Sequence, residues 1–170
     1  MELTSGTYAN VCEKLWAYFG GAATGDACGV PDGEVFALGV FAGLYREGFR
    51  LGGKQVCILG GGDPAGAMAA CLRSGGAAGV TVAEAGQIPE GGAAYYIRLP
   101  GGPEPALTDL TGAEGVCDLT VLPLRSRLLL DAEEADLLTS GGVYPLAAAV
   151  GILRGRTVGA APDPTEVEEV

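Results

Sequence analysis

The stretch that decides the fold reads Gln55-Val56-Cys57-Ile58-Leu59-Gly60-Gly61-Gly62-Asp63-Pro64-Ala65-Gly66. It is an apolar run of strand length that ends on three glycines, and the residues that follow, 67–72, have the composition of a helix. A strand that turns directly into a helix leaves backbone N–H groups unpaired beside the positive end of the helix dipole. We therefore expect an anion or phosphate site at this turn, with binding residues Gly60, Gly61, Gly62, Asp63 and Gly66.

The residues on either side predict alternating helices and strands. Asp32 is expected to cap a helix that ends near Gly48, and residues 80–83 form a second strand. Further expected elements are a helix at 93–97, an irregular loop at 100–115, strands at 118–122 and 124–130, a helix capped by Asp131, a helix at 145–153 and a strand at 156–160. This order predicts an α/β fold, a three-layer α/β/α sandwich around a mostly parallel (mixed) sheet of about four strands. We expect one domain over residues 1–160 and a mobile acidic tail over 161–170.

The composition excludes several classes of protein. The formal net charge of −11 argues against nucleic-acid binding through a basic surface. No basic and apolar leader segment is seen at the amino end, and no apolar stretch is long enough to span a membrane, so we expect no membrane association. The five cysteines include no C-x-x-C pair, so we expect reduced thiols in a cytoplasmic protein. The chain also has no histidine, and no metal site is predicted.

One interpretation of the glycine turn is a dinucleotide fingerprint. Gly60, Gly62 and Gly66 follow a strand directly, and Glu84 lies at the end of the next strand, where an acid that binds a ribose hydroxyl belongs. This interpretation predicts a small Rossmann-like nucleotide- or dinucleotide-binding module. The alternative without a ligand is that the glycines only allow close packing of the helix on the strand.

A second interpretation uses more of the chain, over about residues 3–138. Thr4-Ser5-Gly6-Thr7 near the start, Gly61-Gly62-Asp63 after the strand, Gln87-Ile88-Pro89, the aromatic segment 93–98 and the acidic segment 130–135 follow one another in the order of motifs in the phosphohexomutases. The chain thus resembles the first domain of that family, which comprises phosphoglucomutase and phosphomannomutase. The resemblance implies a phosphosugar ligand and a place in carbohydrate metabolism.

Departures from the family pattern argue against catalysis. The segment 99–112 stands where the family has its phosphoserine loop, and it contains neither Ser nor His. The family's metal-binding motif belongs to a second domain that has no counterpart here. Thr108 and Thr111 are alternatives to the serine, but loop threonines more often bond to their own backbone. We expect no catalytic residue, no cofactor and no activity of the chain alone.

The preferred hypothesis is therefore a non-catalytic, phosphohexomutase-like interaction or phosphosugar-binding domain. A single domain of a family built from four should expose apolar surface, so we expect a homo-oligomer or a protein partner. A phosphorylated small molecule is the expected ligand, held by local donors such as the glycine turn. Arg125 and Arg127, two residues apart, are further candidates for a phosphate contact, although solvated arginines are commoner.

Overall fold

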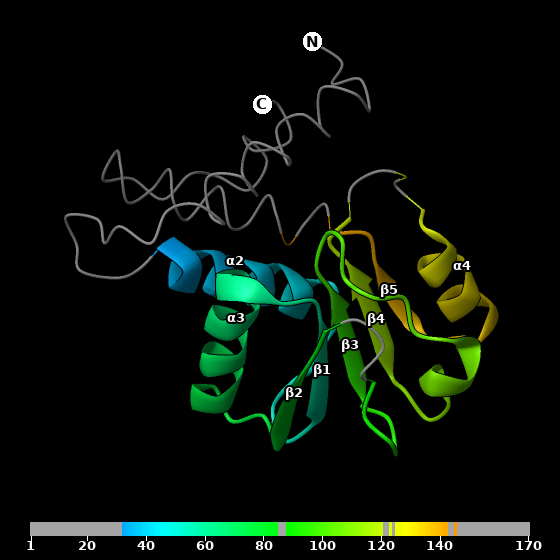
Figure 1. Cartoon of the computed structure of the whole chain (residues 1–170), viewed down its shortest axis with the longest axis horizontal. Helices are drawn as coiled ribbons and strands as arrows, with labels where there is room; N and C mark the ends of the chain where they lie inside the picture. Colours follow the sequence, from blue (N-terminus) through cyan, green and yellow to red (C-terminus); the bar gives the residue numbers. More distant parts are fainter. Residues whose placement is uncertain (1–31, 85–87, 121–122, 124, 143–144, 146–170) are drawn as a thin grey trace, which may run out of the picture.

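The computed structural model describes residues 32–84, 88–120, 123, 125–142 and 145, and its centre is a parallel sheet. The strands are β1 (Gln55–Leu59), β2 (Gly79–Ala83), β3 (Tyr95–Arg98), β4 (Gly115–Asp118) and β5 (Leu138–Ser140). Their order across the sheet is β2-β1-β3-β4-β5, and every neighbouring pair is parallel (Figure 1). The expected α/β fold with a mostly parallel sheet is confirmed, and the described residues form five strands, where about four were expected in a mixed sheet.

Helices cover both faces of the sheet. They are α2 (Asp32–Arg46), α3 (Gly62–Ser74), the short 3₁₀-helix η1 (Leu107–Leu110) and α4 (Arg127–Glu134). Helices α2 and α3 pack together on one face, whereas α4 and η1 lie on the other (Figure 1). The result is the three-layer arrangement that alternating strands and helices predict.

The core divides into two clusters because successive side chains of a strand point to opposite faces. On β1, Val56 and Ile58 join the cluster under α2 and α3, whereas Cys57 and Leu59 join the one under α4. Strand β4 repeats the pattern. A strand covered on both faces is apolar at every position, and this explains the unbroken apolar run of β1.

Three local predictions in the second half of the chain are wrong. The helix expected at 93–97 is replaced by β3, because the aromatic and β-branched residues there are buried in the middle of the sheet. The strand expected at 124–130 and the cap expected at Asp131 are replaced by α4. That helix begins earlier because the Ser126 side chain accepts a hydrogen bond from the Leu129 amide.

Other predictions have mixed outcomes. The strand expected at 118–122 overlaps β4 only at Asp118, residues 119–120 are not in a strand, and residues 121–122 lie outside the described residues. The segment 100–115 is largely irregular, as expected, although it contains η1. Strand β5 was not predicted. The helix expected at 145–153, the strand at 156–160 and the tail 161–170 lie outside the described residues, apart from Pro145.

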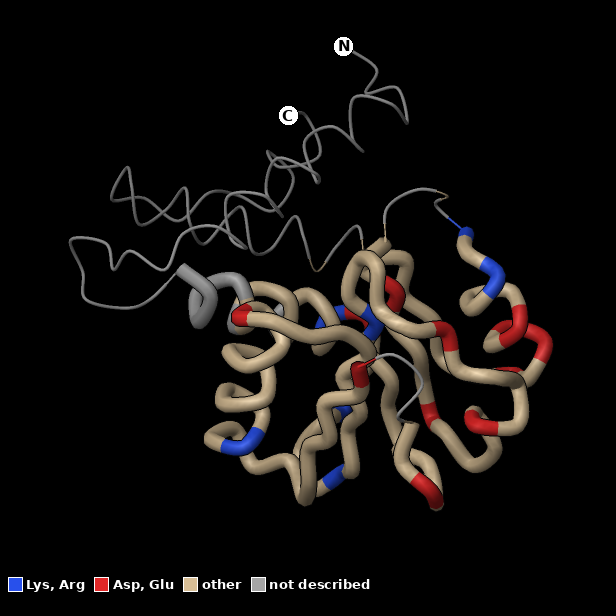
Figure 2. The backbone as a smooth tube through the Cα atoms, viewed as in Figure 1, with Lys and Arg blue, Asp and Glu red and all other residues tan. Residues whose placement is uncertain are grey.

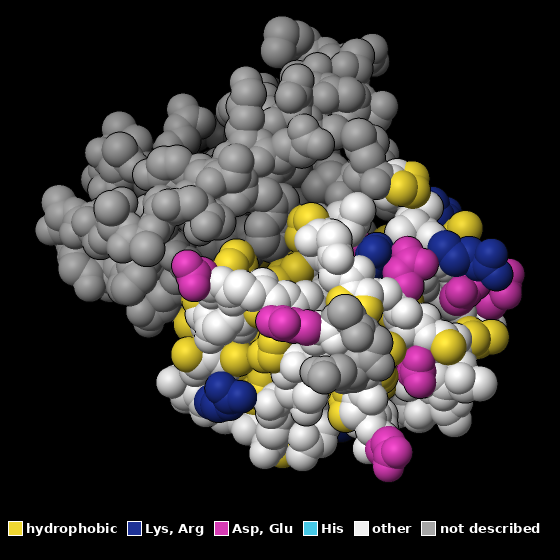
Figure 3. Space-filling view, viewed as in Figure 1, with side chains coloured by type: hydrophobic (Ala, Val, Ile, Leu, Met, Phe, Trp, Pro, Cys, Tyr) yellow, Lys and Arg dark blue, Asp and Glu magenta, His cyan; other side chains and the backbone are white. Residues whose placement is uncertain are grey.

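Most charged side chains lie on the surface of the described part of the chain, whereas Cys57 and Cys117 are buried. The basic position of α4 lies at its start and its acidic positions lie in its second half (Figure 2), and charged side chains alternate with small hydrophobic patches on the face shown in Figure 3. Burial raises the pKa of the Cys57 thiol to about 11 and also raises that of Cys117, so both are neutral and act as small apolar groups. Within the described ranges, no helix is both long and apolar enough to cross a bilayer.

Candidate functional site

The glycine turn joins β1 to α3 at the carboxyl end of the sheet. Gly60 and Gly62 have φ of +148° and +77°, values that side-chain-bearing residues rarely adopt. The Gly60 amide is paired with the Ala83 carbonyl at 2.9 Å. Gly61 is the N-cap of α3, and as a glycine it provides no side chain to cap that end of the helix. The amides of Gly62 and Asp63 are therefore left without a capping side chain from the N-cap residue, as an anion site requires, whereas Pro64 has no N–H to donate.

Asp63 does not close this turn. Its side chain is exposed in the first turn of α3, where a carboxylate interacts favourably with the positive end of the helix dipole. Among the described residues, the Asp63 carboxylate makes no hydrogen bond to the amides of the turn. Its negative charge nevertheless lies beside the site and opposes the binding of an anion.

In the dinucleotide-binding fingerprint, Ala65 takes the place of the third glycine. Ala65 is 1% exposed on the sheet-facing side of α3, where a small residue allows close helix–strand packing. Gly66 is exposed, and a Cβ added there would meet nothing within 4 Å. Residues 60, 62 and 65 thus match the G-x-G-x-x-A form of the motif, and Gly66 has no packing role. Whether Gly66 contacts a ligand stays a prediction.

Glu84 lies against the turn, as the fingerprint interpretation expects. It follows β2, which is the parallel neighbour of β1, so the carboxyl ends of the two strands meet at one edge. A Cβ added to Gly61 would lie 2.8 Å from Cδ of Glu84. The carboxylate is exposed and rests directly over the glycine. The structure therefore brings Gly60, Gly61, Gly62, Asp63 and Glu84 together.

A second tight turn, absent from the sequence predictions, follows β3 beside the glycine turn. The Gly102 amide donates to the Leu99 carbonyl at 2.9 Å, and Gly101 has φ of +75°. Proline at the second position and such a glycine at the third are typical of a type II turn. The turn covers the end of β1. A Cβ on Gly102 would lie 2.8 Å from the Leu59 carbonyl carbon, and one on Gly60 would lie 2.9 Å from Leu99 Cβ.

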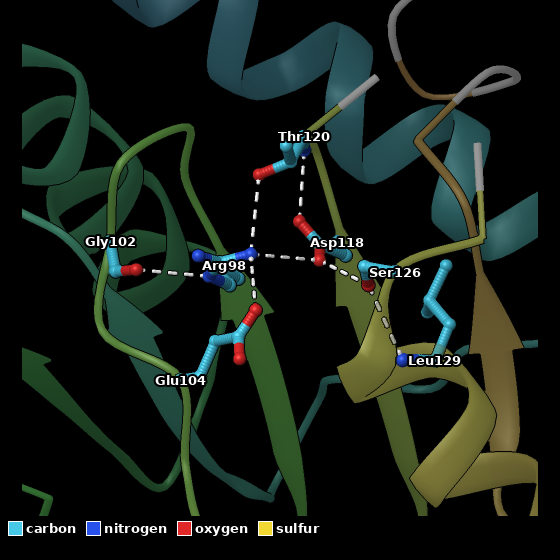
Figure 4. A network of polar contacts seen from close by, with 7 residues as sticks. All are labelled: Arg98, Gly102, Glu104, Asp118, Thr120, Ser126 and Leu129. Atoms are coloured by element: carbon cyan, nitrogen blue, oxygen red, sulfur yellow. Dashed lines mark hydrogen bonds and ion pairs between the residues drawn. The ribbon is translucent and has the colours of Figure 1, made fainter. Parts of the chain in front are cut away.

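A network around Arg98 also escaped the sequence predictions (Figure 4). Arg98 Nε donates to the Gly102 carbonyl at 2.9 Å, and Nη1 lies 3.2 Å from Asp118 Oδ2 and 3.3 Å from Glu104 Oε1. The Asp118 carboxylate is fully buried and accepts a second hydrogen bond from Ser126 Oγ at 2.6 Å. The only sequence signal for this network is a pair of opposite charges, each at the end of a strand.

The other candidates do not converge on this edge. Arg125 is paired with Glu133, and Arg127 lies 3.1 Å from Asp131 on exposed parts of α4. Thr108 and Thr111 are exposed around η1, where the Thr111 amide donates to the Thr108 carbonyl. The two arginines are ion-paired and the two threonines lie around η1, and in the described part of the chain no contact joins any of the four to the glycine turn.

Strand order defines where a ligand would bind. From β1 the chain moves to β2 on one side and then to β3 on the other, so the order reverses between β1 and β3. In open α/β sheets, ligands bind at the carboxyl ends of the strands at such a switch point. The glycine turn and the turn after β3 both lie there. The fold is a parallel α/β fold of the Rossmann type.

Comparison with solved structures leads to the same fold. The chain is similar to a chorismate mutase/shikimate 5-dehydrogenase fusion protein from Clostridium acetobutylicum (TM-score 0.69, 16% identity, 79% of this chain and 58% of that one). It is also similar to shikimate 5-dehydrogenase from Thermus thermophilus in complex with NADP(H) and shikimate (0.66, 21%, 79% and 60%). A third similar structure is quinate dehydrogenase from Corynebacterium glutamicum in complex with NAD (0.60, 20%, 91% and 69%). No family model and no curated protein matches the chain.

These comparisons overturn the resemblance to phosphohexomutases. The similar structures are dehydrogenases of the shikimate and quinate type, and at these identities they establish the fold alone. The segments quoted for the resemblance were short, and one of them, 93–98, is a strand in place of an aromatic helix. The phosphosugar-binding and carbohydrate-metabolism hypotheses fall with it. The chain spans about three fifths of the length of the first two dehydrogenases.

Proposed function

We propose that this chain is a dinucleotide-binding module, with the adenosine half of an NAD-type ligand held at the glycine turn. The observation that carries the proposal is the contact between Glu84 and Gly61 at the switch point of a parallel sheet. An acid at the end of the second strand binds ribose hydroxyls, and the amides at the start of α3 receive the pyrophosphate. The free thiols of the described residues support a reducing compartment such as the cytoplasm.

The residues present fit such a ligand. Gly61 provides no side-chain cap to α3, so among the described residues the amides of Gly62 and Asp63 are available to phosphate oxygens, whereas Pro64 has no N–H. The missing side chain of Gly61 leaves room for the Glu84 carboxylate, whereas Gly62, where an added Cβ would meet only Pro64 Cδ at 3.8 Å, leaves room for a phosphate to approach the main chain. Glu84 favours a ribose with free hydroxyls over one that carries a 2′-phosphate, because two negative groups would then face each other. The proposal therefore specifies NAD over NADP.

Known complexes of the similar proteins support the class of ligand. One of the similar shikimate dehydrogenases was solved with NADP(H), and the quinate dehydrogenase was solved with NAD. Binding of the cofactor is the part of their function that we extend to this chain. Their substrates are not part of the proposal, since the chain spans only about three fifths of the first dehydrogenases.

Thermal unfolding with ligands tests the proposal. A ligand that binds only the folded state stabilises it by about 2.7 kcal/mol at a hundredfold excess over its Kd. We expect the unfolding midpoint to rise with NAD and with ADP, and to rise less with NADP at the same concentration. Glucose 1-phosphate is the matched phosphate-bearing control and should leave the midpoint unchanged. A protein that responds to none of the nucleotides would contradict the proposal.

A further inference from the structure

The turn after β3 is held from one side by a single guanidinium. Arg98 lies at the end of β3 with only 13% of its side chain exposed, and its Nε donates to the Gly102 carbonyl at the far end of the turn. Nη1 contacts the carboxylates of Asp118 and Glu104 (Figure 4). Glu104 lies just beyond the turn and is 48% exposed. Arg98 therefore holds the segment 99–104 at Gly102 and at Glu104.

The Asp118 carboxylate, which pairs with Arg98, is itself held in place by several hydrogen bonds. Asp118 is fully buried and accepts hydrogen bonds from the Thr120 amide at 2.9 Å and from Ser126 Oγ at 2.6 Å. Ser126 in turn caps α4. Three segments, at the ends of β3 and β4 and at the start of α4, are thus joined through one carboxylate. A buried, fully bonded group of this kind has one arrangement rather than several.

The held turn reaches the glycine turn. The Leu99 amide donates to the Leu59 carbonyl at 2.9 Å, which joins the two turns at the ends of β1 and β3. Leu99 Cβ occupies the space beside Gly60 that a side chain there would need. A shift of the turn after β3 would therefore change the surface on the β3 side of the switch point. Glu84, on the β2 side, makes none of these contacts.

We propose that Arg98 is a positioning residue for the second mononucleotide of a bound dinucleotide. This inference rests on the proposed function. A dinucleotide lies across the switch point, so its adenosine half is on the β2 side and its other half is on the side of β3 and β4. Arg98 sets the place of the Leu99–Gly102 turn against which that second half lies. Because it acts through the turn, it affects the whole dinucleotide and leaves ligands that contain only the adenosine half unaffected.

The chemistry requires arginine at this position. The planar guanidinium directs Nε at a carbonyl and Nη1 at two carboxylates, whereas a lysine ammonium is a single point donor. Arg98→Lys keeps the positive charge beside the buried Asp118 and cannot make both sets of contacts. It therefore loosens the turn without leaving a buried carboxylate unpaired, which Arg98→Met would do.

The test is calorimetric titration of the full chain with NAD and with ADP. For Arg98→Lys we expect the Kd for NAD to rise about tenfold and the Kd for ADP to change less than twofold. Glu104→Gln, at an exposed site that tolerates substitution, should shift the NAD Kd in the same direction by about threefold. The matched control is Lys54→Met. It removes the ion pair with Glu114 at the amino ends of the strands, opposite the proposed site, and should change neither Kd.

Each outcome decides a separate question. An equal loss for NAD and ADP in Arg98→Lys would mean general damage to the site and would overturn the inference. No change for either ligand, in a variant with a normal unfolding midpoint, would overturn it as well. If Arg98→Lys does not fold, Glu104→Gln carries the same comparison. Failure of the unaltered protein to bind either ligand would overturn the proposed function itself, together with this inference.

Discussion

The Glu84 carboxylate lies directly over Gly61, although the two residues end different strands. Their approach follows from the pairing of β1 with β2, which brings the ends of both strands to the same edge of the sheet. A side chain at Gly61 would displace the carboxylate. This pair places the acid proposed to face a ribose beside the start of α3, where Gly62 leaves the main chain open to a pyrophosphate.

Removal of the Glu84 carboxylate should change the choice of cofactor. We expect Glu84→Ala to raise the Kd for NAD about tenfold, through loss of charge-assisted hydrogen bonds to the ribose. The same change removes the repulsion of a 2′-phosphate, so the ratio of NADP to NAD affinity should rise. Titration with both cofactors measures this ratio. Glu90→Ala, in an exposed turn, is the control and should leave the ratio as it is.

Gly60, in the turn, and Gly66, in the helix that follows it, should respond oppositely to substitution by alanine. Gly60→Ala combines a φ of +148° with a clash against Leu99, and should destabilise the fold by about 2 kcal/mol or more. Gly66→Ala meets open space in an exposed part of α3 and should stabilise it by about 1 kcal/mol. Urea unfolding of both variants measures the two changes. Destabilisation by Gly66→Ala would show that Gly66 has a packing role after all.

Neutralising Asp63 should lower the stability of the fold and raise its affinity for NAD. The carboxylate in the first turn of α3 stabilises the helix, so Asp63→Asn should lower the free energy of unfolding by about 0.3–1 kcal/mol. It also repels a bound pyrophosphate, so the variant should bind NAD about threefold more tightly at low salt. The gain in affinity should disappear near 1 M NaCl, where screening is nearly complete. An affinity that stays constant at low salt would place the phosphates away from this turn.

Glu47 should make stability depend on pH. Partial burial raises the pKa of its carboxyl group, while the hydrogen bond from Ser140 opposes that rise. A raised folded-state pKa means that stability is fully present below the ordinary glutamate pKa and is lost as the pH rises through the folded value. Glu47→Gln removes this titration and keeps an acceptor for Ser140. Free energies of unfolding should be measured from pH 4 to pH 7 for both proteins. The stability of the variant relative to the unaltered protein should increase as the pH rises.

The first half of the fold could be predicted because its signals are local. The apolar strand, the three glycines and the helix of the β1–α3 unit lie within twenty residues, and both ends of the unit carry turn residues. Glu84 could be predicted for the same reason, since a strand that pairs in parallel with β1 ends at the same edge. The fold class followed from this unit and from the spacing of the next strand.

The second half could not be predicted because its signals are tertiary. Strand β3 is only four residues long and is buried, so it shows no alternation that separates a strand from a helix. Once it is taken as a helix, Arg98 and Asp118 are not at the ends of neighbouring strands, and their contact cannot be foreseen. The cap of α4 also depends on Asp118, to which Ser126 donates. The resemblance to phosphohexomutases was wrong because it depended on short segments, and the order of such segments along the chain does not fix their place in the fold.

The all-parallel sheet has a consequence for how the chain reaches its native state. Paired residues of neighbouring strands are at least 20 positions apart, as for Tyr95 and Gly115, so none of these pairs can close through a tight hairpin. Strand β1 pairs with β2 on one side and with the much later β3 on the other. During synthesis, β1 therefore has only one of its two neighbours until β3 has left the ribosome. Slow refolding, limited by contacts between distant parts of the chain, is the expected kinetic result.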